Sequence, residues 1–363
     1  MNKTCLTMLT IGLLALSSCN TDIDIGGNFN SYNQTALLNN LGENIILTAY
    51  EGLAEETALL QSSTEAFVTA KSEVTLEALK VQLKATRKTW QYCTPYNFGP
   101  AADLGLVFNL NIYPIDQLQV ETNITSGSYD LTTLANNDTK GFQTLGYLLY
   151  GKDKSTADII ASFDLNREKY LTDVVALIDE TSQSVFNNWK NSYLAAFTSA
   201  GANGVDAGSS VGQLVNTMNR DFERNTRDGK IGIPVGIRSL GTPFPEATEA
   251  FFADYSIELL ETNIQGYEDL YTGKTGEGLD DFLMSISAVT RTQSSLDEDI
   301  TAQFSKVKNA ISLVNDPLID AIANQKTQVE TIFAEMQGLI ILFKTDMASS
   351  MGVIITYQDS DGD

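Results

Sequence analysis

Apolar side chains recur every three or four residues over long parts of this sequence, and that period constrains the fold more than any other feature. One such stripe consists of Leu171, Val174, Ile178, Val185 and Trp189. Apolar residues at this spacing share one face of an α-helix, and that face must be buried against another element. Proline, which interrupts helices, occurs only 7 times in 363 residues. The pattern therefore predicts an all-α fold.

The length of the chain and its last two stripes indicate how the helices are grouped. Apolar stripes over residues 296–314 and 318–340 are separated by Asn315-Asp316-Pro317, a turn followed by a helix start. Long helices joined by a short turn are antiparallel neighbours in a bundle. Because 363 residues exceed what one core usually supports, we predict two helical bundles of the four-helix type, residues 34–200 and 201–363.

Four stretches break the helical pattern and are predicted to be irregular. The stretch 199–210 is rich in Gly, Ala and Ser, and we interpret it as a loop between the two halves. The stretch 229–245 contains three prolines and four glycines, which we take to exclude a helix there. The other two stretches are 92–105 and 109–137.

The amino end has the features of a lipoprotein signal peptide, residues 1–18. Lys3 precedes a short apolar run over residues 6–16, which is too short to span a bilayer as a stable helix. Leu16-Ser17-Ser18-Cys19 then matches the lipobox that lipoprotein signal peptidase recognises. The alternative is an ordinary cleaved leader with an incidental cysteine.

We therefore predict that Cys19 carries the lipid that anchors the protein to a membrane, because several acyl chains together anchor firmly. Polar residues 19–33 would form a flexible tether. The predicted location is the bacterial outer membrane, on its periplasmic or its cell-surface face. In the mature chain Cys93 would be the single cysteine left besides Cys19, so no internal disulfide is expected.

Charge and composition exclude several functions. The formal net charge is −23, which disfavours nucleic acid as a partner. The sequence contains no histidine, so neither a Ser-His-Asp triad nor a histidine-based zinc site can be built from it. An enzyme based on a Ser-Lys pair or on paired carboxylates remains open.

Six short segments, in this order along the chain, carry a resemblance to a known family. Together they resemble the imelysin-like family, which is named for an insulin-cleaving metallopeptidase. The resemblance implies two helical bundles with a cleft between them, in an envelope protein that is often a lipoprotein and is frequently linked to iron uptake. The segments are 40–50 (NLGENIILTAY), 87–90 (RKTW), 96–100 (YNFGP), 140–151 (KGFQTLGYLLYG), 230–236 (KIGIPVG) and 352–363 (GVIITYQDSDGD).

The family marker is Gly-x-His-x-x-Glu on a helix, and here it is degenerate. Gly141 matches, but Gln143 stands in place of the His and Gly146 in place of the Glu. A further family Glu, between the Trp and the Phe-Gly-Pro segment, is replaced by Thr94. A neutral amide is a poor ligand for zinc or iron(II) beside imidazole, and glycine has no side chain. We therefore predict no metal and no other cofactor.

Candidate ligand-binding residues in the cleft are Trp90, Phe98 and Arg224. The aromatic side chains near Thr94 could line the cleft, although such residues more often belong to the core. Arg220, Arg224 and Arg227 are spaced to share one helical face, which could hold an anionic ligand. Because acidic residues lie among these arginines, we favour a salt-bridged face over an anion site.

The leading hypothesis is a lipid-anchored, non-catalytic imelysin-like protein that binds a ligand or partner in iron or nutrient acquisition. Its expected partners are the membrane, through the lipid, and an outer-membrane transport protein. The alternatives are a metallopeptidase with non-standard ligands and a structural subunit of an outer-membrane receptor complex.

Overall fold

The protein is described by a computed structural model that covers residues 32–358. The predicted signal peptide, Cys19 and nearly all of the tether lie outside the described residues. Within the described part of the chain, the regular elements are helices, and the β-structure is a single isolated bridge between Val289 and Ser295. No helix in residues 32–358 is long and apolar enough to cross a membrane. The predicted all-α fold is confirmed.

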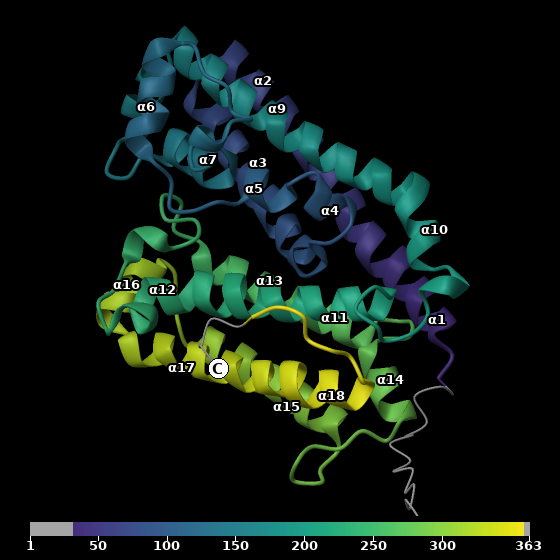
Figure 1. The fold of residues 1–363 in the computed structure, drawn as a ribbon. Helices are drawn as coiled ribbons and strands as arrows, with labels where there is room; N and C mark the ends of the chain where they lie inside the picture. Colours follow the sequence, from purple (N-terminus) through teal and green to yellow (C-terminus); the bar gives the residue numbers. More distant parts are fainter. Residues whose placement is uncertain (1–31, 359–363) are drawn as a thin grey trace, which may run out of the picture.

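The helices lie in two layers, and the amino-terminal half supplies the upper layer in Figure 1. Helices α2, α3 and α9 form its centre, with α7 packed against α3 and α9. The amino-terminal half comprises α1 (Gln34–Asn39), which lies beside the lower layer in Figure 1, and then η1 (Asn40–Leu47), α2 (Thr48–Thr69), α3 (Glu73–Cys93), η2 (Thr94–Tyr96), α4 (Pro100–Asp103), α5 (Leu106–Leu110), α6 (Gln117–Ser126), η3 (Leu134–Asn136), α7 (Gly141–Tyr150), α8 (Thr156–Ala161), α9 (Leu165–Asn188), η4 (Trp189–Tyr193) and α10 (Leu194–Phe197).

The carboxyl-terminal half supplies the lower layer (Figure 1). There α13 packs against α15, and α17 packs against both α15 and η6. This layer comprises η5 (Ala200–Ala202), α11 (Ser210–Asp221), η6 (Phe222–Gly232), α12 (Ile233–Val235), η7 (Ile237–Ser239), η8 (Pro245–Ala247), α13 (Ser256–Thr272), α14 (Leu279–Ser285), α15 (Leu296–Ser312), α16 (Leu318–Asn324), α17 (Lys326–Ile340), η9 (Ile341–Met347) and α18 (Ala348–Met351).

Burial and capping explain the helices that periodicity predicts. The stripe on α9 and η4, from Leu171 to Trp189, is fully buried. Asp164 caps the start of α9 by accepting a hydrogen bond from the Arg167 amide, and Ser72 forms a capping box at the start of α3. The turn at residues 315–317 separates α15 from α16, as predicted.

All four stretches predicted to be irregular contain helical elements, which are short in 92–105 and 199–210 and longer in the other two. Helix α6 lies inside 109–137, where Asp116 caps its start and Gly127, in the left-handed conformation, ends it. The helix that contains η6 continues to Val235, so the prediction that 229–245 excludes a helix is wrong for residues 229–235. Gly232 packs tightly on Phe333 of α17, and such tertiary packing overrides the low helix propensity of glycine.

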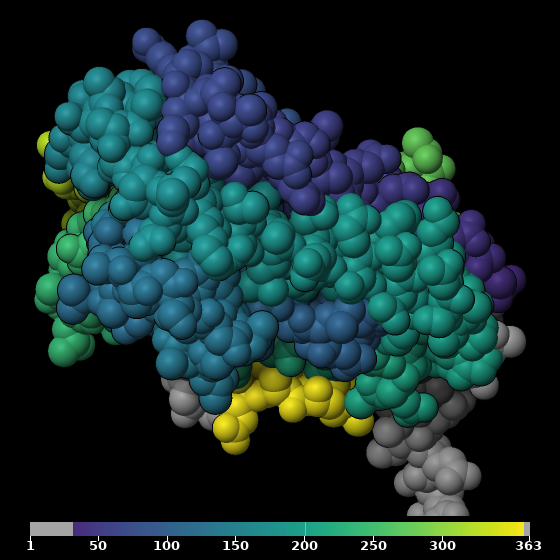
Figure 2. Space-filling model, turned by 90° about the horizontal axis from the view of Figure 1, so that it is seen from above, coloured from purple at the N-terminus to yellow at the C-terminus, as the bar shows by residue number. Residues whose placement is uncertain are grey.

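The two layers share one continuous hydrophobic core, because α3 of the upper layer packs along α13 of the lower layer. A Cβ on Gly266 of α13 would lie 3.3 Å from the Gln91 carbonyl oxygen, so the helices approach closely there. Figure 2 shows the upper layer covering most of the lower one, with the carboxyl-terminal residues visible along one edge. The division at residues 200 and 201 stays a prediction.

Candidate functional site

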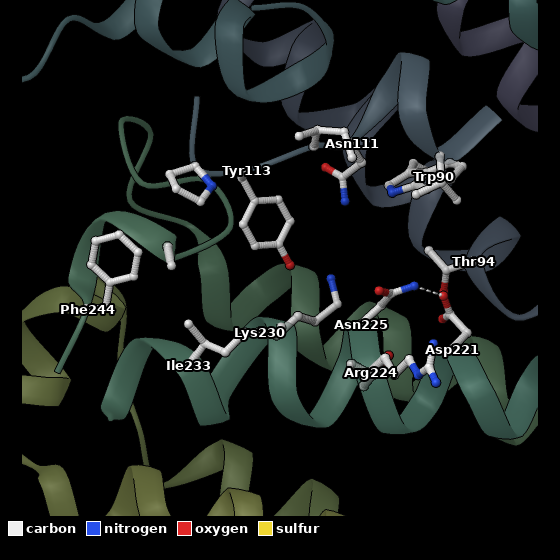
Figure 3. Close-up of a pocket in the computed structure, with 16 residues that line it drawn as sticks. Trp90, Thr94, Asn111, Tyr113, Asp221, Arg224, Asn225, Lys230, Ile233 and Phe244 are labelled. Carbon is white, nitrogen blue, oxygen red and sulfur yellow. Dashed lines mark hydrogen bonds between the residues drawn. The ribbon is translucent and has the colours of Figure 1, made fainter. Parts of the chain in front are cut away.

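A pocket of about 400 Å³ lies where the two layers meet. Its upper wall comes from the end of α3 and from residues 107–114, and its lower wall comes from η6 and α12 (Figure 3). The lower wall is a π-helix, a rare form that occurs frequently at functional sites. The polar residues that line the pocket include Trp90, Thr94, Asn111, Tyr113, Asp221 and Lys230.

The geometry of the π-helix η6 also determines which arginine side chains line the pocket. Arg224 lies at its mouth and is exposed, whereas Arg227 is fully buried and donates a hydrogen bond to Asp228. The prediction that Arg227 shares one face with Arg220 and Arg224 is therefore wrong, because Arg220 and Arg224 are both exposed. The wider turns of a π-helix, which bonds residue i to i+5, change the residues that lie on one face.

Asp221 lies at one end of the pocket and is held on both carboxylate oxygens. The Tyr267 hydroxyl donates to Oδ2 at 2.6 Å, and the Asn225 amide donates to Oδ1 at 2.6 Å. Burial raises the pKa of Asp221, and these hydrogen bonds only partly oppose the rise. Beside it, Thr94 accepts a hydrogen bond from the Asn263 amide at 2.8 Å.

A buried ion pair behind the pocket joins the two layers. Lys230 of the lower layer contacts Glu249 and donates a hydrogen bond to Gln91 Oε1 of the upper layer at 2.7 Å. Glu249 Oε1 accepts further hydrogen bonds from Gln91 Nε2 at 3.1 Å and from Asn111 Nδ2 at 2.9 Å. Burial favours a higher pKa for Glu249, but the charges of Lys230 and Arg87 outweigh it and lower the pKa.

Two buried polar atoms at the pocket have no hydrogen-bond partner among the described residues. They are Trp90 Nε1, a donor, and Asn111 Oδ1, an acceptor. The orientation of the Asn111 amide is fixed, because its nitrogen donates to the Glu249 carboxylate, which can only accept. Figure 3 shows the Trp90 nitrogen turned toward Asn111 and the Tyr113 hydroxyl turned toward Lys230. Trp90 Nε1 and Asn111 Oδ1 can each form one further hydrogen bond.

Apolar side chains form another part of the lining. Val107, Ile112 and Pro114 line the upper wall, while Ile233 and Phe244 belong to the lower layer. Small-molecule sites combine such a lining with a few placed polar groups. The pocket is therefore suited to a small ligand that has an apolar part and at least one hydrogen-bonding group.

Of the residues predicted for the cleft, Trp90 and Arg224 line the pocket, but Phe98 does not. Thr94, a position of the degenerate motif, also lines it. Phe98 is 6% exposed and packs in an aromatic cluster against Trp189 and Phe197, with ring centroids 5.6 and 6.0 Å away. Its assignment to the cleft is wrong, because the chain turns after η2 and directs this ring into the core of the upper layer.

The marker segment forms α7, and its residues do not fit a metal ion. Gln143 is buried, its Nε2 donates to the Thr248 carbonyl at 3.3 Å, and its Oε1 is unpaired. A Cβ on Gly146 would lie 3.8 Å from Nη1 of the buried Arg87. A neutral amide, a missing side chain and an adjacent guanidinium form a poor site for a divalent cation. No group of three His, Cys, Asp or Glu in residues 32–358 is arranged to hold one.

Gly141 of the marker is required by the backbone. Its φ is +80°, and a Cβ there would lie 2.5 Å from the Leu110 carbonyl oxygen. We expect Gly141→Ala to lower the free energy of unfolding. The strained φ should contribute about 1–3 kcal/mol, and the overlap of the new Cβ with the Leu110 carbonyl oxygen should add to that loss. Chemical denaturation would measure this, with Gly208→Ala as the control because nothing lies within 4 Å of its Cβ. Equal stability of both variants would contradict the prediction.

Five residues at or beside the pocket were not predicted from the sequence: Arg87, Asn111, Tyr113, Lys230 and Glu249. Arg87 and Lys230 lie within segments that carry the family resemblance, which was a usable signal. Asn111, Tyr113 and Glu249 lie in irregular segments, where no periodicity in the sequence indicates which side chains point into the protein.

An all-α fold in two layers, with a pocket at their junction, defines the structural class of this protein. A family model described as imelysin, of the M75 peptidases, matches residues 46–340. The chain belongs to the imelysin family.

Two solved structures have the same fold. One is described as a precursor of an iron-regulated protein A from Parabacteroides distasonis ATCC 8503, with 18% identity and a TM-score of 0.73 over 88% of this chain and 95% of that chain. The other is an imelysin-like protein from Psychrobacter arcticum 273-4, with 17% identity and a TM-score of 0.71 over 92% and 99%. No curated protein matches the sequence.

Proposed function

We propose that this chain is a lipid-anchored, non-catalytic member of the imelysin family that binds a small ligand in the pocket between its two layers. The observation that carries the proposal is that two buried polar atoms of pocket residues, Trp90 Nε1 and Asn111 Oδ1, have no hydrogen-bond partner among the described residues. Unpaired buried polar atoms are unfavourable, so a ligand or ordered water that pairs with them stabilises the protein.

Chemical reasoning favours binding over peptide hydrolysis. Hydrolysis by a metallopeptidase needs a Lewis acid that activates water, held by histidine or carboxylate ligands. Gln143, Gly146 and Thr94 provide an amide, no side chain and a hydroxyl at the marker positions. The alternative metallopeptidase would need carboxylate ligands elsewhere in the chain.

A role in iron or nutrient acquisition is proposed from the relatives, one of which is described as iron-regulated. The proposed location is the outer membrane, on its periplasmic or its cell-surface face, with Cys19 as the lipid attachment site and a transport protein as partner. Replacing Cys19 by Ala should move the protein from the membrane fraction to the soluble fraction.

The test compares two tryptophans whose buried indole nitrogens are both unpaired. Native mass spectrometry of the lipidated protein, purified gently from membranes, should reveal a bound small molecule. Trp90→Phe should lose it, because the donor at the pocket is removed, whereas Trp189→Phe should keep it, because Trp189 does not line the pocket.

Equal retention by both variants, or no bound mass, would refute the proposed pocket. Stoichiometric zinc or iron in elemental analysis, together with chelator-sensitive cleavage of unfolded casein, would instead favour the metallopeptidase. Cross-linked recovery of a stable complex with an outer-membrane receptor, with an empty pocket, would favour the structural subunit.

A further inference from the structure

Polar and charged side chains follow one another along the wall of the pocket that α11 and η6 form. Asp221 ends α11, and Asn225 and Lys230 belong to η6. Figure 3 shows these three pocket residues in a row along the helix, with Asp221 and Lys230 at the two ends of the row. Nine positions separate the two charged residues, which places their backbones on the order of 10 Å apart.

The carboxylate at one end of this row has no cation in contact with it. Asp221 is 4% exposed, and both of its oxygens accept hydrogen bonds, which suits the ionised form. No lysine or arginine within residues 32–358 forms an ion pair with it, and Lys230 acts on it only through space. Arg224 is exposed and donates instead to the Gln358 carbonyl oxygen. Because each carboxylate oxygen can accept two hydrogen bonds, Asp221 can still pair with a cation in the pocket.

The other end of the row has hydrogen-bond donors and positive charge. The charges of Lys230 and Arg87 both act on one carboxylate, that of Glu249. An ammonium group has three N–H donors, and Lys230 directs two of them to Glu249 and Gln91. The hydroxyl of Tyr113, which is turned toward Lys230 in Figure 3, is a further donor in the lining of the pocket. This end can therefore bind an anionic group.

The two ends of the row call for opposite charges on one ligand. A ligand with a single charge pairs with one end and leaves the other end without a partner. A zwitterion matches both ends if its charges are far apart, whereas an α-amino acid carries both charges on one carbon atom. The apolar side chains of Ile112 and Ile233 in the lining suit a methylene chain that joins the charged groups.

We propose that the interlayer pocket binds a small zwitterion of the ω-amino acid class, whose ammonium and carboxylate groups lie at opposite ends of an apolar chain. The ammonium group pairs with Asp221, and the carboxylate group accepts hydrogen bonds from Lys230 and from the Tyr113 hydroxyl. This inference rests on the proposed function, because it names the chemical class of the ligand in the same pocket.

Four probes of similar size test the two charged ends separately. 6-Aminohexanoate carries both charges at its two ends, and norleucine is its isomer with both charges on one carbon. Heptanoate keeps only the carboxylate, and hexylammonium keeps only the ammonium group. Isothermal titration calorimetry of the purified mature protein, dialysed extensively to remove any bound molecule, would give the Kd for each probe.

The wild-type protein should bind 6-aminohexanoate at least tenfold more tightly than any of the other three probes, because hydrogen bonds between charged groups are the strong ones. Asp221→Asn keeps the shape of the side chain but removes its charge, so it should bind 6-aminohexanoate no more tightly than heptanoate. Asp153→Asn is the matched control and should keep the wild-type preference, since Asp153 is exposed and lies outside the pocket. Tyr113→Phe should weaken the binding of 6-aminohexanoate and heptanoate alike and leave hexylammonium unchanged.

Three results would overturn the zwitterion. Heptanoate, hexylammonium or norleucine could bind the wild-type protein as tightly as 6-aminohexanoate, or Asp221→Asn could keep the preference for 6-aminohexanoate. Alternatively, no probe could bind. If the native protein nevertheless carries a bound molecule that Trp90→Phe loses, the proposed pocket stands and only its ligand class is wrong. Absence of any bound molecule from the native protein would count against the proposed function itself.

Discussion

Glu249→Gln is expected to lower the free energy of unfolding by about 3–5 kcal/mol, as is typical when one partner of a buried ion pair is removed. Glu249 is 1% exposed, and its carboxylate contacts Lys230, which is itself 5% exposed. The glutamine keeps the shape of the side chain but removes the charge that faces Lys230 and Arg87. Both cations then stay buried without a carboxylate in contact.

Urea denaturation of the purified mature chain would measure this loss. Glu330→Gln is the matched control, because the Lys326–Glu330 pair is about half exposed and should contribute less than about 1 kcal/mol. Lys230→Met should be less damaging than Glu249→Gln, since Arg87 still faces Glu249 when Lys230 is removed. The reverse order would contradict the assigned charge balance.

The same pair makes a pH-dependent contribution to stability. The pKa of Glu249 in the folded protein lies below its ordinary value of 4.5, so folding favours the ionised carboxylate. The contribution is therefore present above pH 4.5 and is lost as the pH falls through the lower folded pKa. The stability difference between the wild-type protein and Glu249→Gln should shrink over that range in a denaturation series.

Phe98→Ala is expected to destabilise the protein by about 3–5 kcal/mol, the usual range for an aromatic residue removed from a core. The ring packs against Trp189, Tyr193 and Phe197, and it is 6% exposed. Its removal leaves a cavity in the upper layer that these large rings cannot readily fill. Because Phe98 does not line the pocket, the folded variant should keep the bound ligand.

Phe108→Ala is the control, since that ring is 58% exposed and its loss should change stability by about 0.5 kcal/mol or less. Thermal and urea unfolding would compare the two variants, and native mass spectrometry would report the ligand. Loss of the ligand from folded Phe98→Ala would indicate that Phe98 belongs to the binding site, and it would contradict the assignment of Phe98 to the core.

The fold class and family could be predicted because they depend on patterns that are local in sequence. The buried stripe of α9 and the turn at residues 315–317 follow from apolar spacing and from turn residues. Helix α6 was missed although Asp116 and Gly127 are ordinary start and stop signals, because its polar sequence has a weak apolar stripe. The helix over residues 229–235 could not be predicted, since it depends on packing against α17.

The candidate site was predicted only in part. Trp90 and Arg224, which were predicted for the cleft, line the pocket. Trp90 belongs to a segment that carries the family resemblance, and Arg224 belongs to an arginine series. Phe98 was misplaced, because an aromatic residue next to a cleft residue in sequence can point the opposite way after a tight turn. The predicted lipid anchor at Cys19 lies outside the described residues and stays a prediction.

By itself, the sequence determined the helical architecture, the absence of histidine chemistry and the weak donor set of the marker helix. These properties depend on residue identity and on spacing along one chain. Only the tertiary structure decided that Lys230 meets Glu249 and that Arg87 lies beside Gly146, across sequence separations of 19 and 59 residues. Interactions between buried charges depend on distance and solvent exclusion in space, and periodicity along the chain carries no information about either.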